Sequence, residues 1–183
     1  MADPLIDEIV EYWFSEGVKP YWFAPTPSFD RQVATLLQEQ HERAAAGELD
    51  SWLDDVDGCL ALCILLDQVP RNVFRGTPQA FATDEKARSV ARHVIDNGFD
   101  LECTPEERVF LYLPFEHHED LESQRLSVRL FRERVQAPEP IEWAQRHLAV
   151  IERFGRFPHR NALLGRESTP EEVEFLKQPG SAF

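Results

Sequence analysis

The segment from Leu53 to Gln68 is apolar on nearly all sides of a helix, and this pattern most constrains the fold. Within it, the run from Cys59 to Leu66 contains only apolar side chains. A helix that is hydrophobic all round belongs in the interior, covered by other elements. The run is also much shorter than the ~20 apolar residues that cross a bilayer. The segment therefore predicts a globular fold built around one central helix.

Capping signals divide the rest of the chain into further helices. Thr104 and Thr169 are each followed by Pro and, three residues later, by Glu, which is the pattern of a capping box. Apolar periodicity predicts helices at residues 4–17, 28–46, 84–98, 110–115, 121–135 and 141–151. Residues 137–140 are predicted to form a turn, and no pair of strands is evident. We predict one all-α domain, residues 1–183, with about eight antiparallel helices in a bundle or short array.

Composition and charge limit the classes of partner. The chain has 183 residues, a formal net charge of −14 and three cysteines, with no apolar segment near Met1 typical of a signal peptide. The negative charge argues against nucleic acid or an anionic membrane as a partner. The odd cysteine count favours reduced, buried thiols. We therefore expect a cytoplasmic protein; its oligomeric state has no signal in the sequence.

Two segments carry the same polar pattern. Arg71-Asn72 and Arg160-Asn161 are each followed by three residues and a Gly, and each segment also contains a Pro. Both offer a guanidinium group, which recognises carboxylate or phosphate groups, and a side-chain amide. The repeated pattern predicts that the two segments contribute to one shared polar site.

Charged residues crowd around both segments. Asp67 and Arg75 flank the first, at the end of the apolar helix, and Arg156 precedes the second in a stretch whose only acid is Glu152. One interpretation is a cleft wall with an acceptor and planar cations for an anionic ligand. The other is a buried Asp67–Arg71 ion pair that stabilises the helix end.

A third polar segment follows Pro114, which disrupts regular helix hydrogen bonding. His117 and Glu119 at this bend are candidates for acid–base catalysis, or else they cap the next helix. Gln124 sits on the buried side of that next helix, where its amide needs partners. A metal site would combine His117, Glu119, His147 or Asp67, but the spacing does not match a zinc-binding helix. We predict neither a metal nor a cofactor.

These segments together resemble a known family. The resemblance is carried by Trp13-Phe14, residues 65–77, residues 113–120 with Gln124, residues 153–161 and residues 164–169. In this order they are similar to the bacterial family catalogued as domain of unknown function 924, over nearly the whole chain. The resemblance implies an all-helical fold similar to tetratricopeptide-like arrays, and no established reaction. The family usually has Ser at the position of His118, which favours His117 and Glu119 as the site residues.

The leading hypothesis is a cleft that binds a small anionic metabolite. Asp67, His117 and Glu119 would orient the ligand or exchange protons with it. The candidate ligand-binding residues are Arg71, Asn72, Arg75, Gln124, Arg156, Arg160 and Asn161. Three alternatives remain: a tetratricopeptide-like module that grips an acidic or C-terminal peptide, a metal-dependent hydrolase, and a buried ion-pair network without a ligand. We predict that Asp67, Arg71, His117 and Arg160 converge.

Overall fold

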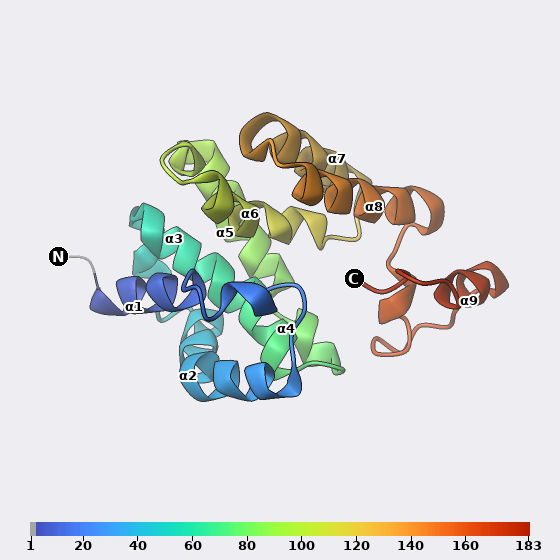
Figure 1. Ribbon diagram of the computed structural model, residues 1–183, viewed down its shortest axis with the longest axis horizontal. Helices are drawn as coiled ribbons and strands as arrows, with labels where there is room; N and C mark the ends of the chain where they lie inside the picture. The colour runs from blue at the N-terminus through green and yellow to red at the C-terminus, as the bar shows by residue number, and fades with distance from the viewer. Residues whose placement is uncertain (1–2) are drawn as a thin grey trace.

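The computed structural model describes residues 3–183, and within this range the chain is helical with no β-strand (Figure 1). The prediction of an all-α fold is confirmed. None of the described helices is both long and apolar enough to span a membrane. The α-helices are α1 (Pro4–Trp13), α2 (Pro27–Ala46), α3 (Val56–Cys63), α4 (Val69–Val73), α5 (Asp84–Asn97), α6 (Pro105–Glu116), α7 (Leu121–Leu130), α8 (Pro138–Phe154) and α9 (Pro170–Leu176).

The apolar helix lies at the centre of the molecule, as its sequence predicts. It begins later than expected, at Val56, because Asp55 caps it by accepting a hydrogen bond from Gly58 N at 2.9 Å. It packs against α1, α5 and α6, and all of its residues from Cys59 onward are buried. It also continues past its predicted end: a π-helical turn, Ile64–Gln68, leads directly into α4, which packs on α2.

The predicted capping signals act at the helix ends. Thr104 and Thr169 form complete capping boxes at the N-termini of α6 and α9. Gly47 and Gly98 end α2 and α5 with φ angles of 85° and 74°, in the left-handed region that favours glycine. The turn predicted at residues 137–140 is wrong, because α8 already begins at Pro138, a residue that suits a first helical turn.

The C-terminal part of the chain has a small apolar cluster of its own. Val150, Ile151 and Phe157 are buried together, and Phe154 and Phe175 pack against them. This cluster joins α9 to the end of α8, at the edge of the molecule away from α1 (Figure 1). The polar site described below lies where this part meets the central helix.

Gly58 lies close to the backbone of Trp52 in the core. A Cβ atom at this position would collide with the backbone carbonyl oxygen of Trp52, whereas a Cβ atom at Gly17 would meet nothing within 4 Å. We therefore expect Gly58→Ala to lower the free energy of unfolding by about 1–3 kcal/mol, in the range of overpacked cores. Urea unfolding measures this change, with Gly17→Ala as the control. Equal stability of the two variants would contradict the close contact.

Candidate functional site

Asp67 is the buried centre of a polar cluster. It lies on the π-helical turn and is 1% exposed. Its Oδ1 atom lies 2.8 Å from His117 Nδ1 and 3.2 Å from an Arg71 nitrogen, and its Oδ2 accepts a hydrogen bond from Gln68 at 2.6 Å. Burial acts to raise the pKa of Asp67, but the charge of Arg71 and the contact with His117 outweigh it and lower that pKa. Asp67 is therefore an ionised carboxylate in the interior.

Arg71 is fully paired. Its guanidinium donates two hydrogen bonds to the Asp84 carboxylate, at 2.8 and 3.0 Å, and a third to the Asp67 carbonyl at 2.8 Å. Asp84 is the first residue of α5, so this fork joins α4 to α5. The Asp67–Arg71 ion pair considered from the sequence is present, and Asp84 is the partner that the sequence did not reveal.

Arg160 is buried without a close carboxylate. It ends the short 3-10 helix Pro158–Arg160 and is 7% exposed. One guanidinium nitrogen donates to the His117 carbonyl at 2.9 Å, another lies 3.8 Å from Asp84, and Nε has no partner among the described residues. The guanidinium carbon lies 4.5 Å from the Phe81 ring centre and 4.7 Å from that of Phe157. Burial, reinforced by Arg71, lowers the pKa of Arg160 to about 10.

His117 has an unpaired ring nitrogen. It caps the C-terminus of α6, and its Nδ1 faces Asp67. Because an ionised carboxylate only accepts hydrogen bonds, we assign the ring proton to Nδ1, which leaves Nε2 as an acceptor with no hydrogen-bond partner in residues 3–183. Burial lowers the pKa of His117, so the ring is neutral at pH 7. A carboxylate-oriented neutral imidazole is the usual arrangement of a general base.

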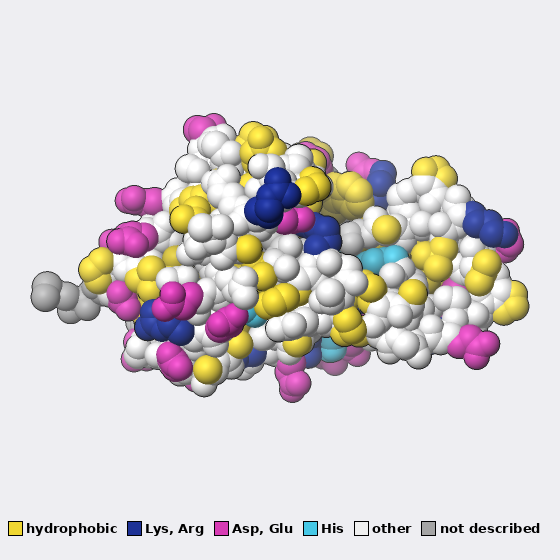
Figure 2. Space-filling view, turned by 90° about the horizontal axis from the view of Figure 1, so that it is seen from below, with side chains coloured by type: hydrophobic (Ala, Val, Ile, Leu, Met, Phe, Trp, Pro, Cys, Tyr) yellow, Lys and Arg dark blue, Asp and Glu magenta, His cyan; other side chains and the backbone are white. Residues whose placement is uncertain are grey.

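Four predicted residues therefore meet in one place. We call Asp67, Arg71, Asp84, His117 and Arg160 the Arg160 cluster. The side chains of Arg71, Asp84 and His117 keep 18%, 15% and 14% of their surface exposed, so the cluster has an edge open to solvent. Histidine surface is visible between the larger part of the molecule and the C-terminal part on the right of Figure 2.

A second buried acid lies beside the cluster. Glu116 is 3% exposed, and its Oε1 lies 3.1 Å from Nδ1 of His147, which also lies 2.8 Å from the Trp143 carbonyl. Burial raises the pKa of Glu116 to about 8, and the Asp67 charge adds to the shift. Burial lowers the pKa of His147 to about 3. At neutral pH the contact is therefore between an uncharged acid and an uncharged imidazole.

Three predicted ligand-binding residues have hydrogen-bond partners outside the Arg160 cluster. Arg75 pairs with Asp30 of α2 at 2.7 Å, and Asn72 donates to the Gln68 carbonyl at 3.0 Å. Gln124 donates to the His118 carbonyl at 2.8 Å and also to the carbonyl of Glu116. These contacts fix the backbone around the site and leave the three side chains without a visible role in binding.

The remaining predicted residues form a neighbouring network with the C-terminal segment. Arg156 pairs with Glu172 at 2.8 Å, and Asn161 donates to the same carboxylate at 3.2 Å. Glu119 accepts two hydrogen bonds from Arg166, at 2.6 and 2.8 Å, and one from Phe157 N at 2.7 Å. The repeated Arg-Asn pattern therefore brings only its two arginines together.

Sequence reasoning missed Phe81, Asp84 and Glu116 as parts of the site. Asp84 was expected only as the first residue of the helix predicted at residues 84–98, and nothing in the sequence singled out Phe81. Glu116 could have been recognised, because this acid directly follows the apolar segment from Phe110 to Phe115, which is buried. Among the described residues, no group of three or more His, Cys, Asp or Glu side chains is arranged to hold a metal ion.

Comparison with known proteins agrees with this fold. A solved structure from Agrobacterium tumefaciens, described as the protein of unknown function ATU0120, is 41% identical and superimposes with a TM-score of 0.91. The match covers 95% of this chain and 97% of that one. No curated protein matches the chain. Residues 9–180 match the profile of the family described as bacterial protein of unknown function (DUF924), and the chain belongs to this family.

Proposed function

We propose that the protein binds a small anionic metabolite at Arg160. Burying a guanidinium group is costly unless a carboxylate or phosphate neutralises it at close range. Arg71 has such partners, but Arg160 shares only Asp84, at 3.8 Å, and its Nε has no partner among residues 3–183. This incomplete pairing of a buried cation is the observation that supports the proposal. A ligand carboxylate or phosphate would supply the missing acceptors.

The same site offers acid–base chemistry. In the proposed complex, Nε2 of His117 accepts a proton from the bound ligand or returns one to it. Asp67 holds the ring through Nδ1 at 2.8 Å and stabilises the cation that forms. Arg71 and Asp84 then fix the geometry without touching the ligand. The metabolite is a cytoplasmic one in this proposal, and its identity is open to experiment.

A thermal-shift screen of carboxylate and phosphate metabolites tests the binding site. A ligand at 100 times its dissociation constant stabilises the folded state by about 2.7 kcal/mol. We expect at least one metabolite to raise the melting temperature of the parent protein but not of Arg160→Lys, because Lys lacks the planar fork. Arg153→Lys is the matched control, since Arg153 pairs with exposed Glu171.

The results of this screen distinguish a ligand-binding role of Arg160 from a purely structural one. Equal shifts in the parent and Arg160→Lys would refute the role of Arg160, and so would a screen in which no carboxylate or phosphate stabilises the parent. Once a ligand is known, His117→Gln should still bind it but lose any proton transfer. A His117→Gln protein with full turnover would contradict the acid–base role.

A further inference from the structure

The exposed face of α7 and of the π-helical turn that follows it, Phe131–Val135, carries arginines without acidic partners. Arg125, Arg129 and Arg132 are spaced four and three residues apart, and Arg92 of α5 approaches the same face. All four are exposed. None of them makes an ion pair or a side-chain hydrogen bond with any residue from 3 to 183; Arg92 only lies over the Phe115 ring, at 5.0 Å. We call these four residues the arginine face.

The arginine face lacks acidic partners although acids outnumber cations in the chain. The chain has 33 acidic residues and 19 Lys and Arg residues, and several exposed arginines outside this face are paired with acids. Arg146 pairs with Glu142, and Arg153 pairs with Glu171 at 2.9 Å. On α7, like charges three and four residues apart repel each other by a few tenths of a kcal/mol per pair. The face is therefore positive within an acidic protein, at a small cost to its stability.

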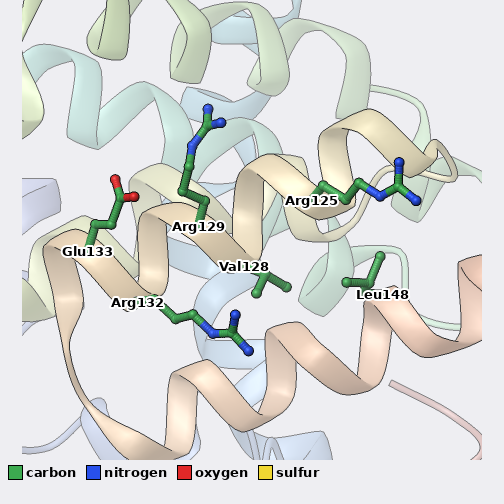
Figure 3. Close-up of a pocket in the computed structure, with 6 residues that line it drawn as sticks. All are labelled: Arg125, Val128, Arg129, Arg132, Glu133 and Leu148. Atoms are coloured by element: carbon green, nitrogen blue, oxygen red, sulfur yellow. The ribbon is translucent and has the colours of Figure 1, made fainter.

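Two hollows follow this face and share Arg125 and Arg129. The first, of about 430 Å³, lies between α7 and α8, with Val128 and Leu148 among its lining residues (Figure 3). The second, of about 560 Å³, lies between α5 and α7 and is lined partly by Leu121 and Leu126. Acidic residues also line the hollows: Asp120, Glu122 and Glu133. The hollows therefore combine an apolar floor with four arginines and three acids in their lining.

The directions of the side chains argue against a compact anion. Figure 3 shows the side chain of Arg129 extending away from α8 and that of Arg132 extending toward it, while Arg125 lies near the N-terminal end of α7. Seven residues of helix separate Arg125 from Arg132, a distance of about 10 Å along the axis. A single phosphate cannot reach all of them. An extended segment with several carboxylates and intervening aliphatic side chains can contact both the arginines and the floor.

We propose that the arginine face docks an acidic, amphipathic segment of a partner protein. Carboxylates of the segment would meet Arg125, Arg129 and Arg132, and its aliphatic side chains would cover Val128 and Leu148. The net charge of −14 on the whole chain repels every polyanion at long range, and it repels a nucleic acid, which has one charge per phosphate, more than a short segment with a few carboxylates. A protein segment is therefore the favoured partner. Arg71 and Arg160 take no part in this face.

Fluorescence anisotropy with a defined probe tests the proposal. The probe is a fluorescein-labelled 15-residue helical peptide with Glu on one face and Leu on the other. Its controls are a scrambled peptide of equal charge and a labelled 15-nucleotide single-stranded DNA. The full-length parent protein is compared with R125Q/R129Q/R132Q and with R43Q/R146Q/R153Q, whose arginines are paired elsewhere.

We expect the parent and the control variant to bind the amphipathic peptide equally, and R125Q/R129Q/R132Q to bind about tenfold more weakly, as loss of three exposed ion pairs implies. The melting temperature of that variant should be unchanged or higher, because like charges are removed. Equal affinity of the two variants, equal binding of the scrambled peptide, tighter binding of the DNA, or no saturable binding below 1 mM would each overturn the proposal. The Arg160 cluster is intact in both variants, so failure of the peptide-binding proposal would not count against the proposed metabolite binding at Arg160.

Discussion

Glu116→Gln is expected to abolish most of the fall in stability that the parent protein shows between pH 6.5 and pH 8. Burial raises the pKa of Glu116 from 4.5 to about 8, so the folded protein holds this proton in a range where the unfolded chain releases it. The free energy of unfolding then falls by about 1.4 kcal/mol per pH unit. Over the interval between the two pKa values, the loss from Glu116 is on the order of 5 kcal/mol. Glutamine is uncharged at every pH and lacks this dependence.

Buried histidines determine how the stability of the parent protein changes at acidic pH. Burial lowers the pKa of His147 to about 3 and that of His159 to about 4, so the unfolded chain binds more protons below pH 6.5. Their contribution to stability is therefore lost as the pH falls below about 6.5. Together with Glu116, these groups place the maximum stability of the parent near pH 6.5.

Urea unfolding from pH 4.5 to pH 8.5 measures the free energy of unfolding on both sides of this maximum. Glu122→Gln is the control, because Glu122 is an exposed residue of α7 and its replacement should leave the profile unchanged. A parent protein whose stability is flat or rises from pH 6.5 to pH 8.5 would show that Glu116 is ionised in the fold. So would a Glu116→Gln profile that parallels the parent.

Asp67→Ala is expected to lower the free energy of unfolding at pH 7 by about 3–5 kcal/mol, the cost of removing one partner of a buried ion pair. The substitution leaves His117 Nδ1 and Gln68 Nε2 without their acceptor and leaves Asp84 as the remaining carboxylate partner of Arg71. The pKa of Asp67 lies below its ordinary value in the fold. Its contribution is therefore complete above the unfolded pKa of about 3.9 and is lost as the pH falls toward the lower folded value.

A surface carboxylate provides the comparison for Asp67. Asp50 pairs with Lys86 at 2.9 Å, but its side chain is 53% exposed, so Asp50→Ala should cost less than about 1 kcal/mol. Chemical unfolding of both variants at pH 7 and at pH 4 measures the difference. If Asp67→Ala were no more destabilising than Asp50→Ala, Asp67 would not be the ionised centre of the cluster.

The helices and the core of the cluster were predictable from local sequence. Capping boxes at Thr104 and Thr169 and the apolar run after Cys59 are local signals, and they mark elements that the structure contains. Polar residues at the end of a buried helix need partners nearby. For that reason, Asp67 and Arg71 were identifiable as parts of a site before any geometry was known.

The rest of the site depends on contacts between distant parts of the chain. Arg71 lies in an α-helix and Arg160 in a 3-10 helix, so the same Arg-Asn pattern points its side chains differently in the two segments. Arg156 was expected to bind the ligand, but Glu172 neutralises it from 16 residues away. Spacing alone cannot tell which acid an arginine will meet. The tetratricopeptide-like arrangement likewise stays a prediction.

Because of the π-helical turn at Ile64–Gln68, the geometry of the site depends on the number of residues that precede Asp67 in this helical segment. Successive residues of a helix are rotated by about 100°, so one residue fewer before Asp67 would turn everything after it by that angle. Ile64, Leu65 and Leu66 are buried and alike in character, and the interior would still be filled by apolar groups. Asp67 would no longer face His117. We therefore expect the segment of residues 64–66 to tolerate exchange of one apolar residue for another far better than an insertion or a deletion. The position of the Asp67 carboxylate depends on the number of residues before it as much as on their chemical character.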